Sequence, residues 1–231
     1  MLVYGRNVAK EVLQKPEKVK KVTLIKNFDD KDINSLLEKN KIRVEYLDKK
    51  GFSKFDKYSH QGIILDIDDF SYTNYKEFLN IDDAKIVILD HLEDPHNMGA
   101  IVRTCEAAGI QGLIIPKDRS VDVNSTVMKT SAGALENFKI AKVTNLINVI
   151  SELKENGFWI VGTALDGVDY RDIDYTGKIA LVIGNEGNGI SKSVLKECDY
   201  VAKIPMYGKI NSLNASVAAG IMIYEVISLD K

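Results

Sequence analysis

Residues 204–227 read IPMYGKINSLNASVAAGIMIYEVI, passing from a short strand through a polar loop into an almost uninterrupted apolar helix. A helix that is apolar on nearly every face is expected to be buried on nearly every face. Its first turn nevertheless carries Ser212, Asn214 and Ser216, which need hydrogen-bond partners if they are buried with it. This combination predicts a site built against an interface, although Asn214 or Ser212 would also serve as a plain helix cap.

Composition and charge narrow the class of protein. The 231 residues are 45% hydrophobic and 28% charged, as in ordinary globular proteins. No apolar run approaches the ~20 residues of a membrane-spanning helix, and the amino terminus lacks the layout of a signal peptide. Cys105 and Cys198 are isolated thiols without metal-ligand spacing, so we expect a reduced, cytoplasmic protein that holds no metal.

Charge is distributed unevenly along the chain. Residues 1–57 contain 15 Lys and Arg against 9 Asp and Glu, whereas the remainder contains 16 against 24. A basic head on an acidic body suits a partner with phosphates, because basic side chains near phosphates release counterions. Scattered surface lysines would give the same count. Charge alone therefore does not distinguish a surface that binds nucleic acid from an ordinary solvated surface.

The pattern of apolar runs divides the chain in two. Residues 1–68 predict a small α/β unit with helices at 6–14 and 31–39 and strands at 21–25, 43–46 and 62–68. A polar and aromatic stretch predicts a linker at 69–83. From residue 84 to 231, continuous apolar runs alternate with helix-length segments, which indicates a parallel sheet covered on both faces. These runs are KIVILD at 85–90, GLIIP at 112–116, KIAKV at 139–143, FWIVGTAL at 158–165, KIALVIG at 178–184 and YVAKIP at 200–205.

Three strand ends are polar or rich in glycine, and ligands of open α/β sheets bind beyond such ends. Residues 89–109 read LDHLEDPHNMGAIVRTCEAAG and predict a helix that starts near Pro95 and ends before Gly109. Arg103 interrupts its small apolar face, either as a solvated side chain or as an inward cation facing an anion. Residues 181–191 read LVIGNEGNGIS, with Glu186 among three glycines. It is neither a GxGxxG fingerprint nor a Walker loop, and glycine spacing alone favours an ordinary strand-to-helix turn.

In order and in context, these segments resemble the SpoU (TrmH) family of RNA 2′-O-ribose methyltransferases, within the knotted methyltransferase superfamily. NMGAIVRTCEAAG is similar to its first motif, LVIGNEGNGIS to its second and IPMYGKINSLNASVAA to its third. VYGRNVAKEVL at 3–13 and HQGI at 60–63 are similar to the substrate-binding domain of bacterial members that modify guanosine in large-subunit rRNA. The resemblance implies a small α/β substrate-binding domain followed by a parallel-sheet α/β methyltransferase domain with a deep trefoil knot, and a homodimer.

The resemblance also implies roles for four side chains. Arg103 matches the essential Arg of the family and would hold the phosphate or ribose oxygen and stabilise the emerging alkoxide, with base action only in a dry site. Asn97 and Asn214 would hold the ribose or anchor the Arg, and Glu186 would orient its loop.

S-adenosyl-L-methionine is the cofactor that the resemblance implies, with RNA as the partner. The chain's three histidines receive lesser roles, His96 as an alternative base and His91 and His60 as structural or RNA-facing residues. The positions that match cofactor-lining residues of the family are Thr163, Ala164, Gly184, Glu186, Ile204, Met206, Ser212 and Leu213.

Alternative functions remain at this stage. The same chemistry on tRNA is the nearest, and the head domain favours rRNA over it. A non-catalytic RNA-binding or ribosome-assembly protein is the second. The presence of all four residues that match the family's catalytic positions argues against it: Asn97, Arg103, Glu186 and Asn214. A dinucleotide-dependent oxidoreductase is disfavoured because LDHLEDPHNMG stands where its glycine fingerprint would follow the first strand.

Overall fold

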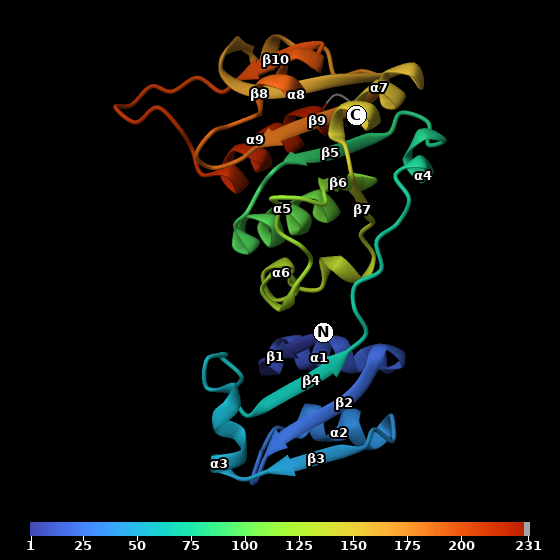
Figure 1. Cartoon of the computed structure of the whole chain (residues 1–231), viewed down its shortest axis with the longest axis vertical. Coiled ribbons are helices and arrows are strands. Elements are labelled where there is room, and N and C mark those ends of the chain that lie inside the picture. The colour runs from blue at the N-terminus through green and yellow to red at the C-terminus, as the bar shows by residue number, and fades with distance from the viewer. Residues whose placement is uncertain (229–231) are drawn as a thin grey trace. The chain divides into compact units, whose positions relative to one another are not determined.

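The computed structural model describes residues 1–228, so the last three positions of the predicted domain 84–231 lie outside the described residues. The chain forms two compact units (Figure 1). The first consists of Met1–Ser71 with Val123–Gly133, and the second of Tyr72–Asp122 with the described residues from Ala134 onward.

The first unit is built on a four-stranded sheet in the order β1-β4-β2-β3. β4 runs antiparallel to both of its neighbours, and β2 runs parallel to β3. Its strands are β1 (Leu2–Tyr4), β2 (Val19–Ile25), β3 (Val44–Leu47) and β4 (Ile63–Ile67). Its helices are α1 (Arg6–Gln14), α2 (Lys31–Lys39), α3 (Lys49–Phe52) and α6 (Ser125–Ser131), with 3-10 turns η1 (Pro16–Lys18) and η2 (Ser53–Phe55). Both predicted helices are confirmed at their predicted bounds.

The core of the first unit lies between the sheet and the apolar faces of α1 and α2. Val8 and Leu13 of α1 and Leu37 of α2 pack with Leu24 of β2. Met128 of α6 packs against the same cluster, so a segment far along the chain completes this unit. The sequence pattern did not predict that contribution.

The second unit contains a six-stranded parallel sheet in the order β10-β8-β9-β5-β6-β7. Its strands are β5 (Lys85–Asp90), β6 (Gly112–Pro116), β7 (Ile140–Val143), β8 (Phe158–Asp169), β9 (Lys178–Gly184) and β10 (Tyr200–Lys203). Its helices are α4 (Lys76–Leu79), α5 (Pro95–Ala107), α7 (Leu146–Glu155), α8 (Lys192–Glu197) and α9 (Ala215–Ser228), with 3-10 turns η3 (Ala134–Glu136) and η4 (Tyr170–Asp172). The predicted α/β class with a parallel sheet is confirmed.

Helices cover both faces of this sheet, which explains its continuous apolar strands. Ile150 of α7 and Val194 of α8 pack with Ile88 and Val182 on one face. On the other face α5 packs against α9, and α9 also contacts β9. Every residue of the central strand β5 is buried. The six predicted strands are all present, and β8 continues four residues beyond its predicted end.

Residues 69–83, the predicted linker, include α4 in the second unit. Phe78 of α4 is fully buried, and a Cβ added at Gly112 would lie 2.2 Å from its ring. Gly112 therefore permits the close approach of this helix to β6.

The closing helix corrects one prediction. α9 buries Ala219, Met222 and Ile223, but Val217 is 51% exposed and Tyr224 is 53% exposed. Burial on nearly every face is therefore wrong for the single chain, because α5 and β9 cover one side of the helix and leave these side chains outside. No helix among residues 1–228, α9 included, is long and apolar enough to cross a membrane.

Candidate active site and nucleic-acid interface

The carboxyl ends of β5 and β9 lie side by side, with Asp90 opposite Gly184 in the parallel register. The loop after β5 leads into α5, whose first turn is capped by Asp94: its Oδ1 accepts the backbone N–H of His96 at 2.8 Å. Pro95 occupies the first helical position, where its missing N–H costs no hydrogen bond. Because Asp94 serves as the cap, the side chain of Asn97 is left to bond elsewhere.

Asn97 connects three segments that are far apart in the sequence. Its side chain is 5% exposed. Its Nδ2 donates to Glu186 Oε1 at 2.9 Å, and its Oδ1 accepts from Asn214 Nδ2 at 3.0 Å. One residue from each of the three predicted motifs thus meets in a single hydrogen-bonded group, which we call the Asn97 cluster (Asn97, Glu186 and Asn214).

Asn214 also starts the closing helix. Its Oδ1 accepts the backbone N–H of Ser216 at 2.9 Å and the Ser216 hydroxyl at 2.6 Å. The predicted cap is therefore Asn214, while Ser212 is exposed in the loop before it. The polar first turn of α9 is satisfied locally and through Asn97.

Arg103 lies further along α5, where its side chain is exposed. Of the two interpretations of this residue, the solvated one describes the single chain. Within the described residues Arg103 is not part of the Asn97 cluster. Its neighbour Thr104 lies beside α9: a Cβ added at Gly220 would be 4.0 Å from Thr104 Cγ2.

The glycine loop after β9 is tightly folded. Asn185 N–H donates to the Gly189 carbonyl at 3.0 Å, and Gly189 N–H returns to the Asn185 carbonyl at 2.9 Å. A Cβ added at Gly184 would lie 2.1 Å from the Gly189 carbonyl carbon. Only glycine fits there, so the backbone of this loop folds closely over the end of the strand.

The second stretch predicted to line the cofactor lies in β8. The register between β8 and β10 jumps from Gly162–Val201 to Val168–Ala202, so residues 163–167 leave the ladder. Thr163 and Ala164, at the start of this irregular stretch, are half-buried, and Thr163 Oγ1 donates to the Val182 carbonyl at 3.2 Å. Backbone groups released from the ladder need other partners, and a bound ligand can supply them.

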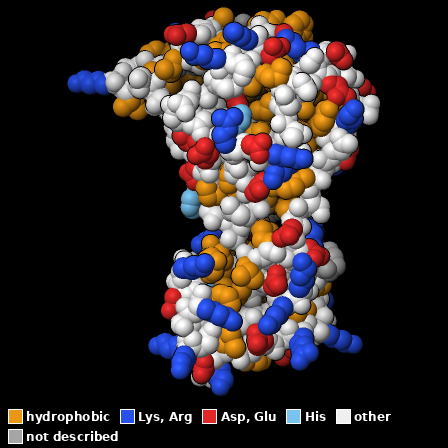
Figure 2. All heavy atoms as spheres, viewed as in Figure 1, with side chains coloured by type: hydrophobic (Ala, Val, Ile, Leu, Met, Phe, Trp, Pro, Cys, Tyr) orange, Lys and Arg blue, Asp and Glu red, His pale blue; other side chains and the backbone are white. Residues whose placement is uncertain are grey.

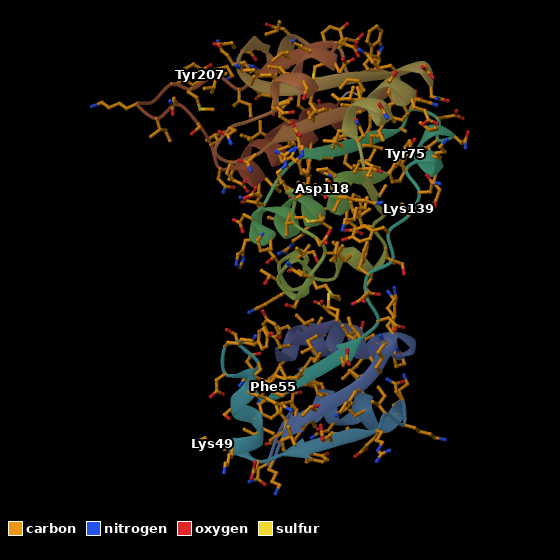
Figure 3. All side chains as sticks on the ribbon, viewed as in Figure 1. Lys49, Phe55, Tyr75, Asp118, Lys139 and Tyr207 are labelled. Atoms are coloured by element: carbon orange, nitrogen blue, oxygen red, sulfur yellow. The ribbon has the colours of Figure 1, made fainter. Side chains whose placement is uncertain are left out.

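The third stretch is the loop between β10 and α9, which extends away from the sheet (Figure 1). Ile204, Met206 and Leu213 are half-buried in it. Tyr207 is 88% exposed, and Figure 3 shows it on this loop. Ile210 is 70% exposed. Large apolar side chains held in solvent on one loop indicate that a ligand or partner covers them.

No group of three or more His, Cys, Asp or Glu among residues 1–228 is placed to hold a metal ion. Both cysteines are free thiols. Burial raises the pKa of Cys105, and burial raises the pKa of Cys198 to about 11, so both stay protonated at neutral pH.

Asp90, the last residue of β5, was not selected from the sequence, and His91 was given only a lesser role. His91 Nδ1 lies 2.6 Å from Asp90 Oδ1, and the Asp90 carboxylate is buried. His96 is exposed one residue before Asn97. An acidic residue at the end of an otherwise apolar strand is the sequence signal that marks Asp90.

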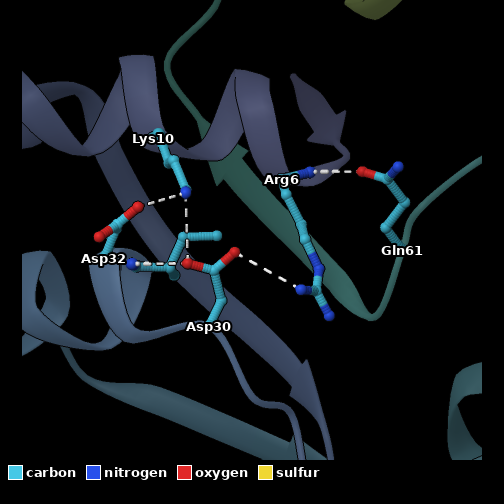
Figure 4. Close-up of polar contacts among 6 residues, drawn as sticks. Arg6, Lys10, Asp30, Asp32 and Gln61 are labelled. Carbon is cyan, nitrogen blue, oxygen red and sulfur yellow. Dashed lines mark hydrogen bonds and ion pairs between the residues drawn. The ribbon is translucent and has the colours of Figure 1, made fainter.

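In the first unit, the two segments near residues 3–13 and 60–63 meet. The Arg6 backbone N–H donates to Gln61 Oε1 at 2.8 Å, and the rings of Tyr4 and Tyr58 lie 4.8 Å apart (Figure 4 shows the Arg6–Gln61 bond). Arg6 also pairs with Asp30 at 3.6 Å, and its guanidinium lies 5.0 Å from the centre of the Phe28 ring.

Basic side chains accompany aromatic rings elsewhere in this unit. Lys54 lies 5.0 Å from the Phe55 ring centre and Lys57 lies 5.0 Å from that of Tyr58. Figure 2 shows Lys and Arg side chains scattered over this unit's visible surface, with Asp and Glu side chains among them. Cations combined with stacking surfaces are typical of single-stranded nucleic-acid binding.

A six-stranded parallel sheet with a polar site at its strand ends defines an α/β protein that binds its ligand at that edge, and the first unit adds cations beside aromatic rings. Residues 84–224 match the SpoU rRNA Methylase family, and residues 2–73 match the RNA 2′-O ribose methyltransferase substrate-binding domain. The chain belongs to the SpoU/TrmH family of RNA methyltransferases.

Individual relatives agree over nearly the whole chain. A putative TrmH family tRNA/rRNA methyltransferase of Staphylococcus aureus is 41% identical over 234 residues, covering 97% of this chain and 94% of the relative. The crystal structure of an S-adenosylmethionine-bound rRNA methyltransferase from Sinorhizobium meliloti has a TM-score of 0.80 and 25% identity, covering 99% of this chain and 87% of the other. The SpoU methyltransferase AviRb of Streptomyces viridochromogenes, also solved with S-adenosylmethionine, has a TM-score of 0.82 and 24% identity. The match covers 100% of this chain and 90% of the AviRb chain. S-adenosylmethionine is the cofactor of this family, as predicted.

Proposed function

We propose that this chain is an RNA ribose 2′-O-methyltransferase that acts on a guanosine of large-subunit rRNA in the cytoplasm. The observation that supports it most directly is the Asn97 cluster, because it joins the three motif segments through side chains. The head unit supports an RNA substrate, since it matches a substrate-binding domain and carries basic and aromatic side chains. Free thiols agree with a reducing compartment.

The cofactor-holding residues in this proposal are the eight predicted positions. Gly184 and the loop after it offer backbone groups, while Ile204 and Leu213 offer apolar contact. When bound, S-adenosylmethionine would supply the electrophilic methyl group: the ribose 2′-oxygen would gain the methyl as the carbon–sulfur bond breaks with its electrons staying on sulfur, and the hydroxyl proton would pass to water.

The chain's own residues would then position the ribose and neutralise its developing charge. Arg103 holds the phosphate or the 2′-oxygen and stabilises the alkoxide as the proton leaves. Asn97 and Asn214, already oriented by each other, hold the ribose, and Glu186 fixes the glycine loop. A guanidinium remains charged at neutral pH, so electrostatic stabilisation is the role that its chemistry favours.

We further propose that the enzyme is a homodimer and that the closing segment forms a deep trefoil knot. Val217 and Tyr224 are half-exposed and lie two turns apart on one face of α9, which supports a second subunit that covers this face. The long loop that carries the chain from the edge strand β10 back to α5 supports the knot. Tyr224→Asp is expected to shift the protein from dimer to monomer in sedimentation velocity.

The direct test is methyl transfer from radiolabelled S-adenosylmethionine to separate, unmodified rRNA and tRNA transcripts. Wild type is compared with Arg103→Ala and with the control Glu155→Ala, an exposed change at the end of α7. Label in rRNA with wild type and the control, but not with Arg103→Ala, supports the chemistry, the substrate and the role of Arg103. Digestion and nucleoside analysis identify the methylated base and the 2′-position.

The same chemistry on tRNA is the second candidate, supported by the tRNA/rRNA name of the Staphylococcus aureus relative. Label in tRNA alone would favour it. A non-catalytic RNA-binding protein is the third candidate, and it requires that S-adenosylmethionine neither binds nor raises the melting temperature.

A further inference from the structure

A cavity of about 200 Å³ lies in the second unit beside the Asn97 cluster. The loops that follow β5, β6 and β9 form its walls, and none of residues 163–167 or 204–214 lines it. It therefore shares only the glycine loop after β9 with the stretches proposed to hold the cofactor. Its lining includes Asp90, His91, Glu93, Arg119, Asn185 and Asn188.

Hydrogen bonds hold two of these walls together. Asp90 Oδ2 accepts the Ser191 backbone N–H at 2.7 Å, and Asn185 Nδ2 donates to the His91 carbonyl at 2.8 Å. These two bonds join the loop after β5 to the loop after β9, as the Asn97–Glu186 bond does. The cavity and the Asn97 cluster thus share the segment 90–97 and the loop after β9.

The third wall is fixed in the same manner. The Leu92 carbonyl accepts the backbone N–H of Val121 at 2.8 Å and the hydroxyl of Ser120 at 3.3 Å. These bonds hold the loop that carries Arg119 against the segment that carries Glu93. Figure 3 labels Asp118 on this loop.

Two lining residues have an unusual backbone conformation. Arg119 has φ of 50° and His91 has φ of 59°, both in the left-handed region. Non-glycine residues other than Asn, Asp and His rarely adopt it, so Arg119 is the more notable of the two. Such conformations gather at functional sites, where a particular side chain is needed at a strained position.

The charges of the cavity argue against a phosphate as its occupant. Asp90 and Glu93 bring two carboxylates against the single guanidinium of Arg119. Both oxygens of Asp90 already have partners, His91 and Ser191. Glu93, exposed on its loop, is the carboxylate placed to accept from a ligand. A neutral, planar ligand suits these side chains if its adjacent hydrogen-bond donors meet the Glu93 carboxylate and a separate acceptor meets the Arg119 guanidinium.

We propose that the cavity binds the guanine base of the nucleotide to be methylated, an inference that rests on the proposed function. Guanine offers N1–H and N2–H₂ side by side, which the Glu93 carboxylate accepts, and O6 and N7, to which Arg119 donates. Adenine places an acceptor where N1–H stands and faces the carboxylate with its lone pair. A base turned out of its stack is read through its edges in such a pocket. Glu93 and Asn185 are close in sequence to Asn97 and Glu186, so the attached ribose would lie toward the Asn97 cluster.

The test replaces the target guanosine by inosine, which lacks the 2-amino group, in an otherwise identical rRNA transcript. Wild type is expected to methylate the inosine transcript with kcat/KM reduced about tenfold or more, because one of the two donors is missing. Glu93→Gln is expected to methylate the guanosine transcript less well than wild type does. The ratio of kcat/KM for the guanosine transcript to kcat/KM for the inosine transcript should fall to about two or less. Glu93→Asp is expected to retain part of the discrimination. Arg119→Ala lowers kcat/KM for both transcripts by a similar factor.

Matched controls are Glu155→Gln and Lys117→Ala, exposed charge changes outside the cavity lining, which should leave the ratio at its wild-type value. Equal melting temperatures and S-adenosylmethionine affinities of wild type and Glu93→Gln show that the fold and cofactor site are intact. A wild-type ratio retained in Glu93→Gln, or methylation of adenosine or a pyrimidine, overturns the base pocket and leaves the methyltransferase intact. Binding of cofactor without transfer to any RNA overturns the proposed function and the pocket with it.

Discussion

The loops at the ends of β5 and β9 differ sharply from the loop after β10. The first two are tied to each other by three bonds, Asn185 to His91, Ser191 to Asp90 and Asn97 to Glu186. The loop after β10 extends from the sheet with Tyr207 88% exposed, and Asn214 at its far end bonds to Asn97.

This difference teaches how the site is divided. One side is fixed in advance by buried strands and side-chain hydrogen bonds, which is what catalytic positioning requires. The other side exposes apolar surface that cofactor, RNA or a second subunit would cover. Substitutions on the fixed side should affect both stability and activity, and those on the exposed loop should affect activity with little change in stability.

The largest effect is expected for Asn97→Ala. It removes one partner each from Glu186 and Asn214, so kcat/KM should fall about 10²–10³-fold and stability by about 1–3 kcal/mol. Methyl-transfer kinetics and chemical denaturation measure the two effects. Asn148→Ala, an exposed change on α7, is the matched control and should alter neither. Full activity in Asn97→Ala would refute the assigned role of the Asn97 cluster.

Gly184→Ala should have the next largest effect. Its Cβ would lie 2.1 Å from the Gly189 backbone, so the glycine loop must shift. We expect S-adenosylmethionine binding to weaken about tenfold or more, with a stability loss of about 1–3 kcal/mol. Calorimetric titration measures the binding.

Gly187→Ala provides the comparison for this variant. There the nearest atom, Asn185 Oδ1, would be 3.6 Å from the new Cβ, so the substitution should be tolerated. Equal cofactor affinities in the two variants would show that the loop after β9 does not hold the cofactor.

The double change Tyr207→Ala with Ile210→Ala tests the exposed loop. Both side chains are mostly in solvent, so stability should stay within about 0.5 kcal/mol of wild type. Methyl transfer should nevertheless fall several-fold, because the covering surface for cofactor or RNA is smaller. A large drop in melting temperature with unchanged kinetics would mean that this loop belongs to the fixed side.

The smallest effect is expected at the base of that loop, where Asp169 ends β8 opposite Lys203. Arg171 donates from Nε to Asp169 Oδ1 at 2.9 Å and from Nη2 to Oδ2 at 2.6 Å, and these bonds lower the pKa of Asp169 to about 2. A lowered carboxyl pKa stabilises the fold above about pH 4, and this contribution is lost as the pH falls toward 2. Asp169→Asn should therefore have a slightly lower melting temperature than wild type at pH 7. The difference in melting temperature should become smaller by pH 3. A constant difference would mean that the charge of Asp169 contributes nothing.

Local patterns were sufficient to place most elements. The amphipathic segments 6–14 and 31–39 and the apolar strands 85–90 and 178–184 form where predicted, because side-chain periodicity and burial agree there. The placement of α6 in the first unit had no local signal, since it depends on Met128 reaching a core formed by distant residues.

The candidate site shows the same division. The motifs identified Asn97, Glu186 and Asn214, but their mutual hydrogen bonds depend on the register of β5 beside β9 and on the return of the chain to α9. Asp90, Glu93 and Arg119 were not selected, because the cavity they line exists only once three separate strand ends are adjacent.

The sequence by itself determined the family, the cofactor and the α/β class, because these depend on ordered motifs and on the burial pattern of each segment. The tertiary structure decided which polar groups meet, that Arg103 is exposed and that α9 is half-covered in the single chain. Those properties depend on contacts between residues far apart along the chain, which no local pattern encodes.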